Sequence, residues 1–325
     1  MENINFISTV RSNSKNLESS NSITQNYDLN PWWVTGITDS EGNFSINYNK
    51  VANKISASYK VTQNEHSMDM LYKLKNYFGV GSICIDNRKE NAYKFVISNS
   101  DLLVKKVIPH FDKYPLVGSK NLYFLAFKKA VELFENKGRT VNKDLIISIK
   151  NAMNKKRSFS DRWEYLNKKI VTVNAHWVQA FIDGEGSFQF TIVNTVNRNK
   201  PYLSTNPTLE VAQHSHEVKV LDAIRIFFGV GYLKPNYDIN SLTDVKSSRT
   251  VTRLIISQAK VVIDFVDKYP MFTIKHLDYL DWKKLAELKC KNLHKTEAGL
   301  SDMKLIKSHM NRGRLLNSSL LTSSD

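Results

Sequence analysis

One set of landmark residues occurs twice in the chain in the same order, and this internal repeat restricts the fold more than any other feature. The stretch WVTGITDSEG at 33–42 returns as WVQAFIDGEG at 177–186, so that Glu41 matches Glu185 at an offset of 144 residues (185 − 41). Five further matches follow in step: VTQ at 61–63 with VAQ at 211–213, FGVG at 78–81 with 228–231, IS at 97–98 with 256–257, YP at 114–115 with 269–270, and Lys120 with Lys275. Matches of this extent predict duplication of a module of domain size.

The repeat divides the chain into five parts. A flexible N-terminal arm (1–29) precedes the first repeat (30–136), a basic linker (137–172) connects it along the outside to the second repeat (173–314), and a loose tail (315–325) follows. With 325 residues and 42% hydrophobic residues, the chain is large enough to bury a core in each repeat.

The charge balance of the chain indicates a polyanionic partner. The sequence contains 46 Lys and Arg against 31 Asp and Glu, a net charge of +15, and nucleic acid is the first candidate partner for a folded protein this basic. No run of about 18 apolar residues occurs, so we expect no membrane-spanning segment. Cys84 and Cys290 fit neither a disulfide framework nor a zinc site, so that an essential metal would have oxygen ligands.

Each repeat has the pattern helix, two strands, helix, two strands, helix. Asn30 before Pro31, and Asn174 in the second repeat, are typical N-caps of an opening helix that ends at Gly42 or Gly186. Alternation of apolar and polar residues predicts strands after these helices, at 43–49, 55–62 and 187–192. Helices predicted at 66–78, 122–135, 217–228 and 277–289 would cover the apolar face of each sheet and leave the other face polar.

Two acids end the opening helices at positions where their charges would meet. Gly36 and Ala180 are matched small residues that allow the two helices to pack closely, which would bring Glu41 and Glu185 side by side. The helix dipole opposes negative charge at a helix C-terminus, and a hard divalent cation would relieve the repulsion. Mg²⁺ is the natural candidate for such an all-oxygen site. The other matched acids, Asp39 and Asp183, are interpreted as structural groups that hydrogen-bond a facing loop or helix end.

The residues Val34–Gly42 and Val178–Gly186 resemble the two copies of the LAGLIDADG motif, and the chain resembles the single-chain, two-repeat LAGLIDADG homing endonucleases of fungal mitochondrial introns. The resemblance extends over residues 30–314 and includes, in family order, HKTEAGL at 294–300 and MNRGR at 310–314. It implies an α+β fold, the pseudo-twofold duplicated αββαββα LAGLIDADG fold, whose two antiparallel β-sheets form a saddle on the major groove of DNA. It also implies cleavage of both strands, across the minor groove, at a long asymmetric target site.

The resemblance further implies roles for single residues in each half. Glu41 and Glu185 match the metal-binding acids, and the backbone carbonyls of Ser40 and Gly184 are implied as additional ligands. Gln63 and Gln213 match the position that orders solvent near the attacking water.

The implied basic residue of the site is present in one repeat only. Lys234 matches a residue that helps to stabilise the scissile phosphate, but Cys84 stands at the equivalent position of the first repeat. This departure makes the two sites unequal and leaves Lys94 as a candidate substitute. Lys94 matches Arg253 in the repeat, and a phosphate contact is the preferred interpretation of both.

Polar side chains on the predicted strands are the candidates for base recognition, because such strands can lie in the major groove. In the first half they are Asn43, Ser45, Asn47, Ser56, Ser58 and Lys60, and in the second half Ser187, Gln189, Thr191, Glu210 and Lys234.

These observations predict a site-specific endonuclease that hydrolyses double-stranded DNA with Mg²⁺ and functions as a monomer, since both halves are in one chain. Ca²⁺ is expected to occupy the metal sites without supporting cleavage. One alternative is an RNA-binding maturase that binds its host intron on the same fold, and another is a DNA-binding protein that no longer cuts. Retention of both Glu41 and Glu185 favours cleavage, because an RNA scaffold would not need two metal-binding carboxylates. A mitochondrial location is implied by the family resemblance.

Overall fold

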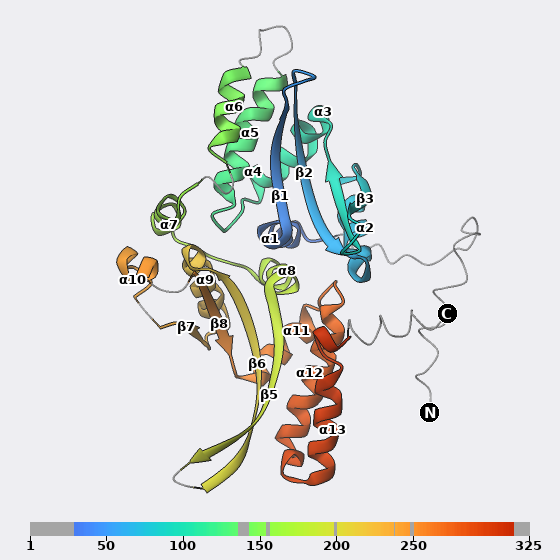
Figure 1. Cartoon of the computed structure of the whole chain (residues 1–325), viewed down its shortest axis with the longest axis vertical. Helices are drawn as coiled ribbons and strands as arrows, with labels where there is room; N and C mark the ends of the chain where they lie inside the picture. The colour runs from blue at the N-terminus through green and yellow to red at the C-terminus, as the bar shows by residue number, and fades with distance from the viewer. Residues whose placement is uncertain are drawn as a thin grey trace, which may run out of the picture.

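The computed structural model describes residues 29–135, 143–153, 157–197, 200–236, 238–247 and 250–314. The predicted arm, apart from Leu29, and the predicted tail lie outside the described residues. The described chain forms two halves that meet at two central helices, α1 (Pro31–Glu41) and α8 (Ala175–Glu185) (Figure 1).

The first half consists of one four-stranded sheet and the helices packed on it. The chain continues from α1 through β1 (Gly42–Asn49), β2 (Lys54–Asn64), the 3₁₀ turn η1 (Glu65–Ser67), α2 (Met68–Phe78), β3 (Ser82–Asn87), β4 (Ala92–Ile97), α3 (Ser100–Leu102), η2 (Leu103–Val107), α4 (Ile108–Lys113) and α5 (Asn121–Glu135).

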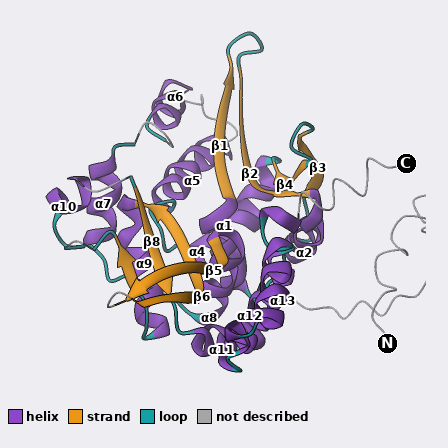
Figure 2. Cartoon of the chain, turned by 60° about the horizontal axis from the view of Figure 1, so that its bottom comes forward, coloured by secondary structure: helices purple, strands orange, loops and turns teal. Residues whose placement is uncertain are grey.

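The second half has the same order of strands and main helices, with α11 (Ala259–Lys268) in place of α3, η2 and α4, and adds two helices. Its elements after α8 are β5 (Gly186–Asn197), β6 (Lys200–His214), η4 (Ser215–Glu217), α9 (Val218–Phe228), β7 (Tyr232–Lys234), α10 (Leu242–Ser247), β8 (Val251–Ile256), α11 (Ala259–Lys268), α12 (Lys275–Cys290), η5 (Leu293–Lys295) and α13 (Glu297–Ser308). The additions are α10, between the last two strands, and α13, after α12 (Figure 2). In both halves a further helix, α4 or α11, precedes the predicted final one.

The two sheets have the same topology and register. Their strand orders are β1-β2-β4-β3 and β5-β6-β8-β7, with antiparallel pairing throughout. Gly42 is opposite Val61 in the first sheet, as Gly186 is opposite Val211 in the second. One face of each sheet is buried under helices, and the two sheets extend from the central helix pair in opposite directions (Figure 1).

The central helices pack at van der Waals distance because a small residue stands at their crossing. A Cβ on Gly36 would lie 2.5 Å from the carbonyl oxygen of Trp177 and 2.9 Å from the Cβ of Ala180. The residues of α1 from Trp33 to Asp39 are all buried, as expected for a helix enclosed on every side. The predicted N-caps form, because the side chains of Asn30 and Asn174 accept hydrogen bonds from the backbone N–H groups of Trp32 and Trp177 at 2.9 and 3.1 Å.

The segment predicted as a basic linker also contributes to the cores. It contains α6 (Lys143–Asn151) and α7 (Phe159–Asn167), whose apolar faces are buried. Ile146 and Met153 belong to the core of the first half, and Leu166 belongs to that of the second. The segment was expected to run only along the outside, but its two helices bury apolar side chains in the cores of both halves.

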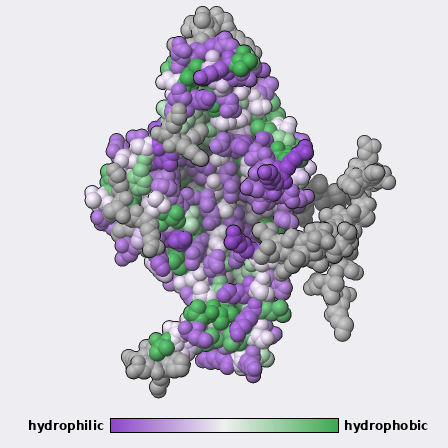
Figure 3. Space-filling model, in the orientation of Figure 1, coloured by the Kyte–Doolittle hydropathy of each residue, from purple (hydrophilic) through white to green (hydrophobic). Residues whose placement is uncertain are grey.

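The exposed surface in the view of Figure 1 is mostly hydrophilic, with separate hydrophobic patches (Figure 3). None of the described helices combines the length and the apolar character needed to cross a membrane.

A buried histidine predicts how the stability of the first half depends on pH. His110 is 7% exposed, and its ring nitrogens contact the hydroxyls of Thr35 at 3.3 Å and Tyr77 at 2.9 Å. Burial lowers the pKa of His110 to about 3, whereas in the unfolded chain the group takes up a proton near its ordinary value of about 6.5. The free energy of unfolding should therefore fall as the pH decreases from about 6.5 towards 3, by about 1.4 kcal/mol per pH unit for this group.

Urea unfolding at several pH values measures this contribution. Because carboxyl groups titrate in the same range, the comparison is between the wild type and His110→Gln, whose slope of stability against pH should differ by about one proton. Replacement of the exposed His66 by Gln is the control and should keep the wild-type slope. Equal slopes for wild type and His110→Gln would contradict the prediction.

Candidate active site

Two small pockets lie at the junction of the halves, one beside each matched glutamate. The first, here called the Glu185 pocket, has a volume of about 260 Å³ and is lined by Glu185 and Gln213 from the second half and by Ser40 and Lys120 from the first. Each half therefore supplies part of this pocket.

The second, here called the Glu41 pocket, has a volume of about 150 Å³ and mirrors the first. It is lined by Glu41 and Gln63 from the first half and by Gly184 and Lys275 from the second. In both pockets the glutamate and the glutamine come from one half. The lysine comes from the other half, together with the residue that precedes that half's own glutamate, Ser40 or Gly184. The pseudo-twofold relation of the repeats thus produces two composite sites.

The two acids lie within each other's electrostatic field. A Cβ on Gly184 would lie 2.5 Å from the Cβ of Ser40 and 3.4 Å from the Cγ of Glu41, so the ends of α1 and α8 are in contact. Burial raises the pKa of Glu41, and the Glu185 carboxylate raises it further. Burial also raises the pKa of Glu185, while the charge of Lys120 and a hydrogen bond from Gln213 act to lower this pKa. The helix pair therefore brings the two acids together, as its sequence pattern predicted.

Lys120 and Lys275 place two positive charges at the same helix ends. Lys120 Nζ donates hydrogen bonds to the carbonyl oxygens of Thr38 at 2.9 Å and Ser40 at 3.1 Å. Lys275 Nζ donates in the same way to Ile182 at 3.1 Å and Gly184 at 2.9 Å. Burial lowers the pKa of both lysines, while the neighbouring acids raise it. Each ammonium group thus satisfies carbonyls at a helix C-terminus and offsets the charge of the acids.

Sequence reasoning matched Lys120 with Lys275 but gave them no role in the site. Lys234, which the resemblance implied as the basic residue, lies exposed at the end of β7, opposite Arg253 in the register. Among the described residues that line the two pockets, Lys120 and Lys275 supply the lysine side chains. The signal that could have identified them was their matched place in the repeat, two residues before a predicted helix.

Asp39 and Asp183 are structural, and this prediction is confirmed. Asp39 accepts hydrogen bonds from the backbone N–H groups of Val117 at 2.8 Å and Gly118 at 3.2 Å and from Trp177 Nε1 at 2.8 Å. Asp183 accepts from the backbone N–H groups of Phe272 at 2.6 Å and Thr273 at 3.2 Å. Burial raises the pKa of Asp39 to about 6. Both aspartates hold the loop that leads into a lysine-bearing helix.

The predicted DNA-contacting residues share one face of each sheet. In the first half, the register pairs Asn43 with Lys60, Ser45 with Ser58 and Asn47 with Ser56, so the six candidates form three cross-strand pairs. Lys94 lies opposite Thr62 and Cys84 on the same face. The second-half face carries Ser187, Gln189, Thr191, Glu210, Lys234 and Arg253, and the register adds Asn206 and Thr208 opposite Thr191 and Gln189.

Ion pairs organise the charges on these faces. Asp86, which sequence reasoning missed, accepts hydrogen bonds from Lys94 Nζ at 2.9 Å and Lys60 Nζ at 3.3 Å. The hydrogen bond from Lys94 lowers the pKa of Asp86. In the second half, Arg253 Nε lies 4.0 Å from Glu210 Oε2. The predicted phosphate-binding residues Lys94 and Arg253 are thus held on the sheet face by carboxylates.

The oxygen donors of the two pockets suit a hard divalent cation. Two carboxylates with raised pKa values stand beside main-chain carbonyls at the helix ends, a donor set of the kind that Mg²⁺ and Ca²⁺ prefer. Over the described part of the chain, no group of three or more His, Cys, Asp and Glu side chains could hold a metal ion. Carbonyls of Ser40 and Gly184, together with oxygens from solvent or substrate, would have to complete the coordination.

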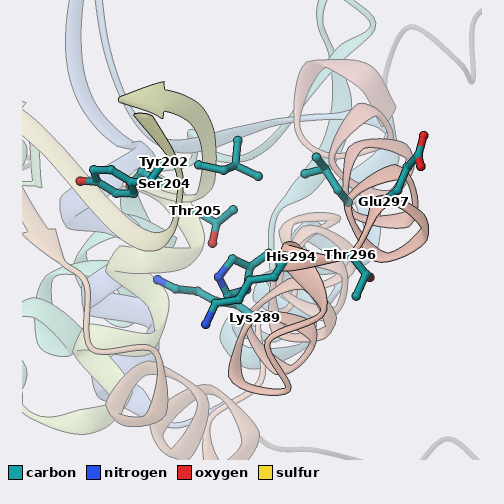
Figure 4. Close-up of a pocket in the computed structure, with 10 residues that line it drawn as sticks. Tyr202, Ser204, Thr205, Lys289, His294, Thr296 and Glu297 are labelled. Carbon is teal, nitrogen blue, oxygen red and sulfur yellow. The ribbon is translucent and has the colours of Figure 1, made fainter. Parts of the chain in front are cut away.

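A larger cavity, of about 710 Å³, lies elsewhere, between β6 and the segment from α12 to α13 (Figure 4). Tyr202, Ser204 and Thr205 line it from the strand, and Lys289 and His294 line it from the helical side. Neither matched glutamate contributes to it. The size of a cavity is therefore no guide to the acid sites of this protein.

Comparison with known proteins places these features in one family. The family model described as LAGLIDADG endonuclease matches residues 34–131 and 180–286, one stretch in each half. A probable intron-encoded endonuclease of Neurospora crassa is 26% identical over 297 residues, which cover 86% of this chain and 54% of that protein. A probable intron-encoded DNA endonuclease of Mycosarcoma maydis is 25% identical over 285 residues, 79% of this chain and 98% of the relative. The chain thus spans about half the length of the first of these relatives.

Solved structures show the same architecture. The I-SmaMI LAGLIDADG homing endonuclease bound to cleaved DNA is 26% identical, with a TM-score of 0.72 over 88% of this chain and 98% of that one. I-SmaMI has also been solved on an uncleaved DNA target with calcium ions, with a TM-score of 0.71. The duplicated α+β fold, the two antiparallel sheets and the family model agree, and the chain belongs to the LAGLIDADG endonuclease family.

Proposed function

We propose that the protein is a site-specific endonuclease that cleaves both strands of a long, asymmetric DNA site, with Mg²⁺ as its cofactor. The observation that carries the proposal is the pair of composite pockets, each lined by a matched glutamate and glutamine from one half and a matched lysine from the other. Two matched sites in one chain suit the cutting of two strands by a monomer. The names of the relatives, as intron-encoded endonucleases of fungi, support this activity. A mitochondrial place of action is supported by a relative from Saccharomyces cerevisiae that is named as a mitochondrial protein.

Glu41 and Glu185 would hold Mg²⁺, with the carbonyls of Ser40 and Gly184 as further ligands. When bound, the metal supplies Lewis acidity at the scissile phosphate and an activated water. Gln213 donates a hydrogen bond to Glu185, and Gln63 lines the matched pocket beside Glu41. Each glutamine amide would orient solvent near its acid. Lys120 and Lys275 supply the positive charge that stabilises a phosphate in each pocket.

The polar sheet faces would carry the DNA duplex. Strands of both sheets present amide, hydroxyl and basic side chains, which can bond base edges and phosphates in the major groove. DNA phosphates would compete with Asp86 for Lys94 and with Glu210 for Arg253. The paired acids and lysines favour cleavage over a maturase role, because RNA binding alone would require neither pocket.

Selection from a random duplex library tests the proposal. Fragments cut by the protein in Mg²⁺ are sequenced beside fragments retained in Ca²⁺ without cutting. We expect one long site in both sets, with cuts on both strands in Mg²⁺. Retention of duplexes without any cutting would replace the endonuclease with a DNA-binding protein, and retention of no DNA would return the RNA-binding alternative to first place.

Replacement of the pocket lysines distinguishes them from Lys234. Lys120→Met and Lys275→Met should each slow the single-turnover cleavage of one strand by about 100-fold, because each removes a charge next to the reacting phosphate. Lys234→Met is the matched control on the exposed strand end and should weaken DNA binding in Ca²⁺ more than it slows bound-state cleavage. A larger loss of single-turnover rate in Lys234→Met than in Lys120→Met would restore Lys234 as the basic residue of the site.

A further inference from the structure

The loops that lead into the two lysine-bearing helices are anchored in almost the same way. Three consecutive backbone N–H groups, at 117–119 in one loop and 272–274 in the other, donate to side chains of the helix ends around them. The first two of each set donate to Asp39 or Asp183. The third N–H in each set crosses to the opposite half, and here the two pockets differ.

In the Glu185 pocket the third anchor is a carboxylate. Glu217 accepts from the backbone N–H of Ser119 at 3.0 and 3.2 Å and also from the Ser119 hydroxyl. In the Glu41 pocket the backbone N–H of Ile274 donates to the hydroxyl of Ser67 at 3.2 Å. Glu217 and Ser67 are at matched positions, each four residues after the pocket glutamine, Gln213 or Gln63. Two donor groups of Ser119 bonded to a carboxylate in one pocket therefore correspond to one neutral bond in the other.

Glu217 is held in place by neighbouring histidines of the second half, which in turn pack against α7 of the inter-repeat segment. Its side chain is 13% exposed and lies 3.4 Å from His216 Nε2, while His216 Nδ1 is 2.6 Å from His214 Nδ1. The ring of Phe159, on α7, packs on both histidines with centroids 5.8 Å apart in each case. Burial raises the pKa of Glu217, but hydrogen bonds from His216 and Ser119 lower it overall, so the group is ionised at neutral pH.

The same helix also holds the loop itself. Lys169, two residues after α7, donates from Nζ to the carbonyl oxygen of Val117 at 2.8 Å, and Asn121 Nδ2 donates to the hydroxyl of Tyr165 at 2.6 Å. Gly118 leaves no free space, because a Cβ there would lie 3.1 Å from Glu217 Oε2 and 3.2 Å from Asp39 Oδ1. The backbone directly before Lys120 is thus enclosed between two carboxylates.

We infer that Glu217 is a positioning residue that sets Lys120 in the Glu185 pocket from the opposite half, so that the two strand-cutting sites depend on different anchors and one can be disabled alone. The inference rests on the proposed nuclease function. Ser119 precedes Lys120 directly, and release of its N–H would let the first turn of α5 shift away from the carbonyls of Thr38 and Ser40. A displacement of about 1 Å in a positioned group can cost about 100-fold in rate.

Strand-resolved cleavage tests the inference. The wild-type target duplex recovered by selection is labelled differently on its two strands, and single-turnover rates are measured in Mg²⁺. Lys120→Met and Lys275→Met identify the strand served by each pocket. Glu217→Ala should slow the Lys120-dependent strand by about 30-fold or more and the other strand by less than about threefold, so that nicked DNA accumulates. Its affinity for the duplex in Ca²⁺ should stay within about threefold of the wild type, since the DNA-facing strands are unchanged.

Three further variants complete the comparison. Glu217→Ser, which copies the group found at Ser67, should slow the same strand by less than Glu217→Ala does. Ser67→Ala is the matched control and should slow the Lys275-dependent strand by about fivefold, because only one neutral bond is lost. Glu217→Gln keeps the acceptor oxygen and the side-chain volume, so if thermal unfolding shows that Glu217→Ala is not folded at the assay temperature, Glu217→Gln should still slow the Lys120-dependent strand by about tenfold.

Equal slowing of both strands by a folded Glu217 variant, or an unchanged rate on the Lys120-dependent strand, would overturn the inference while leaving the nuclease function in place. Failure of the wild type to cut either strand would remove the proposed function itself, so the two results are distinguishable.

Discussion

Glu41→Gln and Glu185→Gln are each expected to abolish double-strand cleavage, with a loss of about 10³-fold or more in the single-turnover rate. Gln has almost the same volume as Glu and keeps one acceptor oxygen, but it lacks the charge that a divalent cation requires. The variants should still bind the target duplex in Ca²⁺, because the proposed DNA-contacting residues lie on the sheet faces, away from the substituted acids. Gel-shift titration in Ca²⁺ and single-turnover cleavage in Mg²⁺ measure the two effects separately.

The loss of cleavage reports on metal binding only if the two variants fold as the wild type does. Removal of one acid lowers the repulsion at the helix ends, because the Glu185 carboxylate contributes to the raised pKa of Glu41. Both variants should therefore unfold at the wild-type temperature or above it. Asp86→Asn, which removes a carboxylate from the sheet face and leaves the pockets intact, is the matched control and should keep a measurable cleavage rate on both strands. Full activity in either glutamate variant would refute the metal-binding role.

Gly36→Val should produce the largest loss of stability, about 3 kcal/mol or more in the free energy of unfolding. A Cβ alone would lie 2.5 Å from the backbone oxygen of Trp177, and a main-chain atom of a packed helix cannot move aside as the end of a flexible side chain can. The two helices would have to separate, which would also part Glu41 from Glu185. Urea unfolding should show the loss of stability, and any folded fraction should bind DNA but cleave it slowly.

The partner residue at the crossing provides the control. Ala180→Gly removes a methyl group from the same contact, so it should cost only about 1 kcal/mol, the difference in helix propensity between Ala and Gly. Stability equal to the wild type in Gly36→Val would show that the helices are not packed as closely as the structure describes.

The sequence allowed the strand faces and the helix pair to be predicted because both follow from local patterns. Alternation placed Ser45 and Ser58 on a polar face, and the sheet register sets them opposite each other, where their hydroxyls are 2.8 Å apart. Gly36 and Ala180 predicted a close helix crossing, and the crossing forms there. By contrast, α4 was not predicted; it follows α3 and η2 and is separated from α5 by residues 114–120.

The pocket lysines could not be identified from the sequence because their role depends on contacts between the halves. Nothing near Lys120 in the chain shows that its ammonium group will bond carbonyls some 80 residues earlier, at Thr38 and Ser40. Glu217 was missed for the opposite reason. A search for repeats detects identity, whereas Glu217 matters because it differs from Ser67 at the matched position.

The exchange of anchors between the halves has an evolutionary consequence. After duplication, two identical modules would have carried the same residue at the positions of Ser67 and Glu217. Because each of these residues bonds a loop of the other half, a substitution at either position would be accepted only if that loop still fitted it. Across homologous chains, residue 217 should therefore covary with residues 117–119 of the other repeat more strongly than with its own neighbours. A recombination event that replaced one whole repeat would separate these partners, which favours inheritance of the two repeats as one unit.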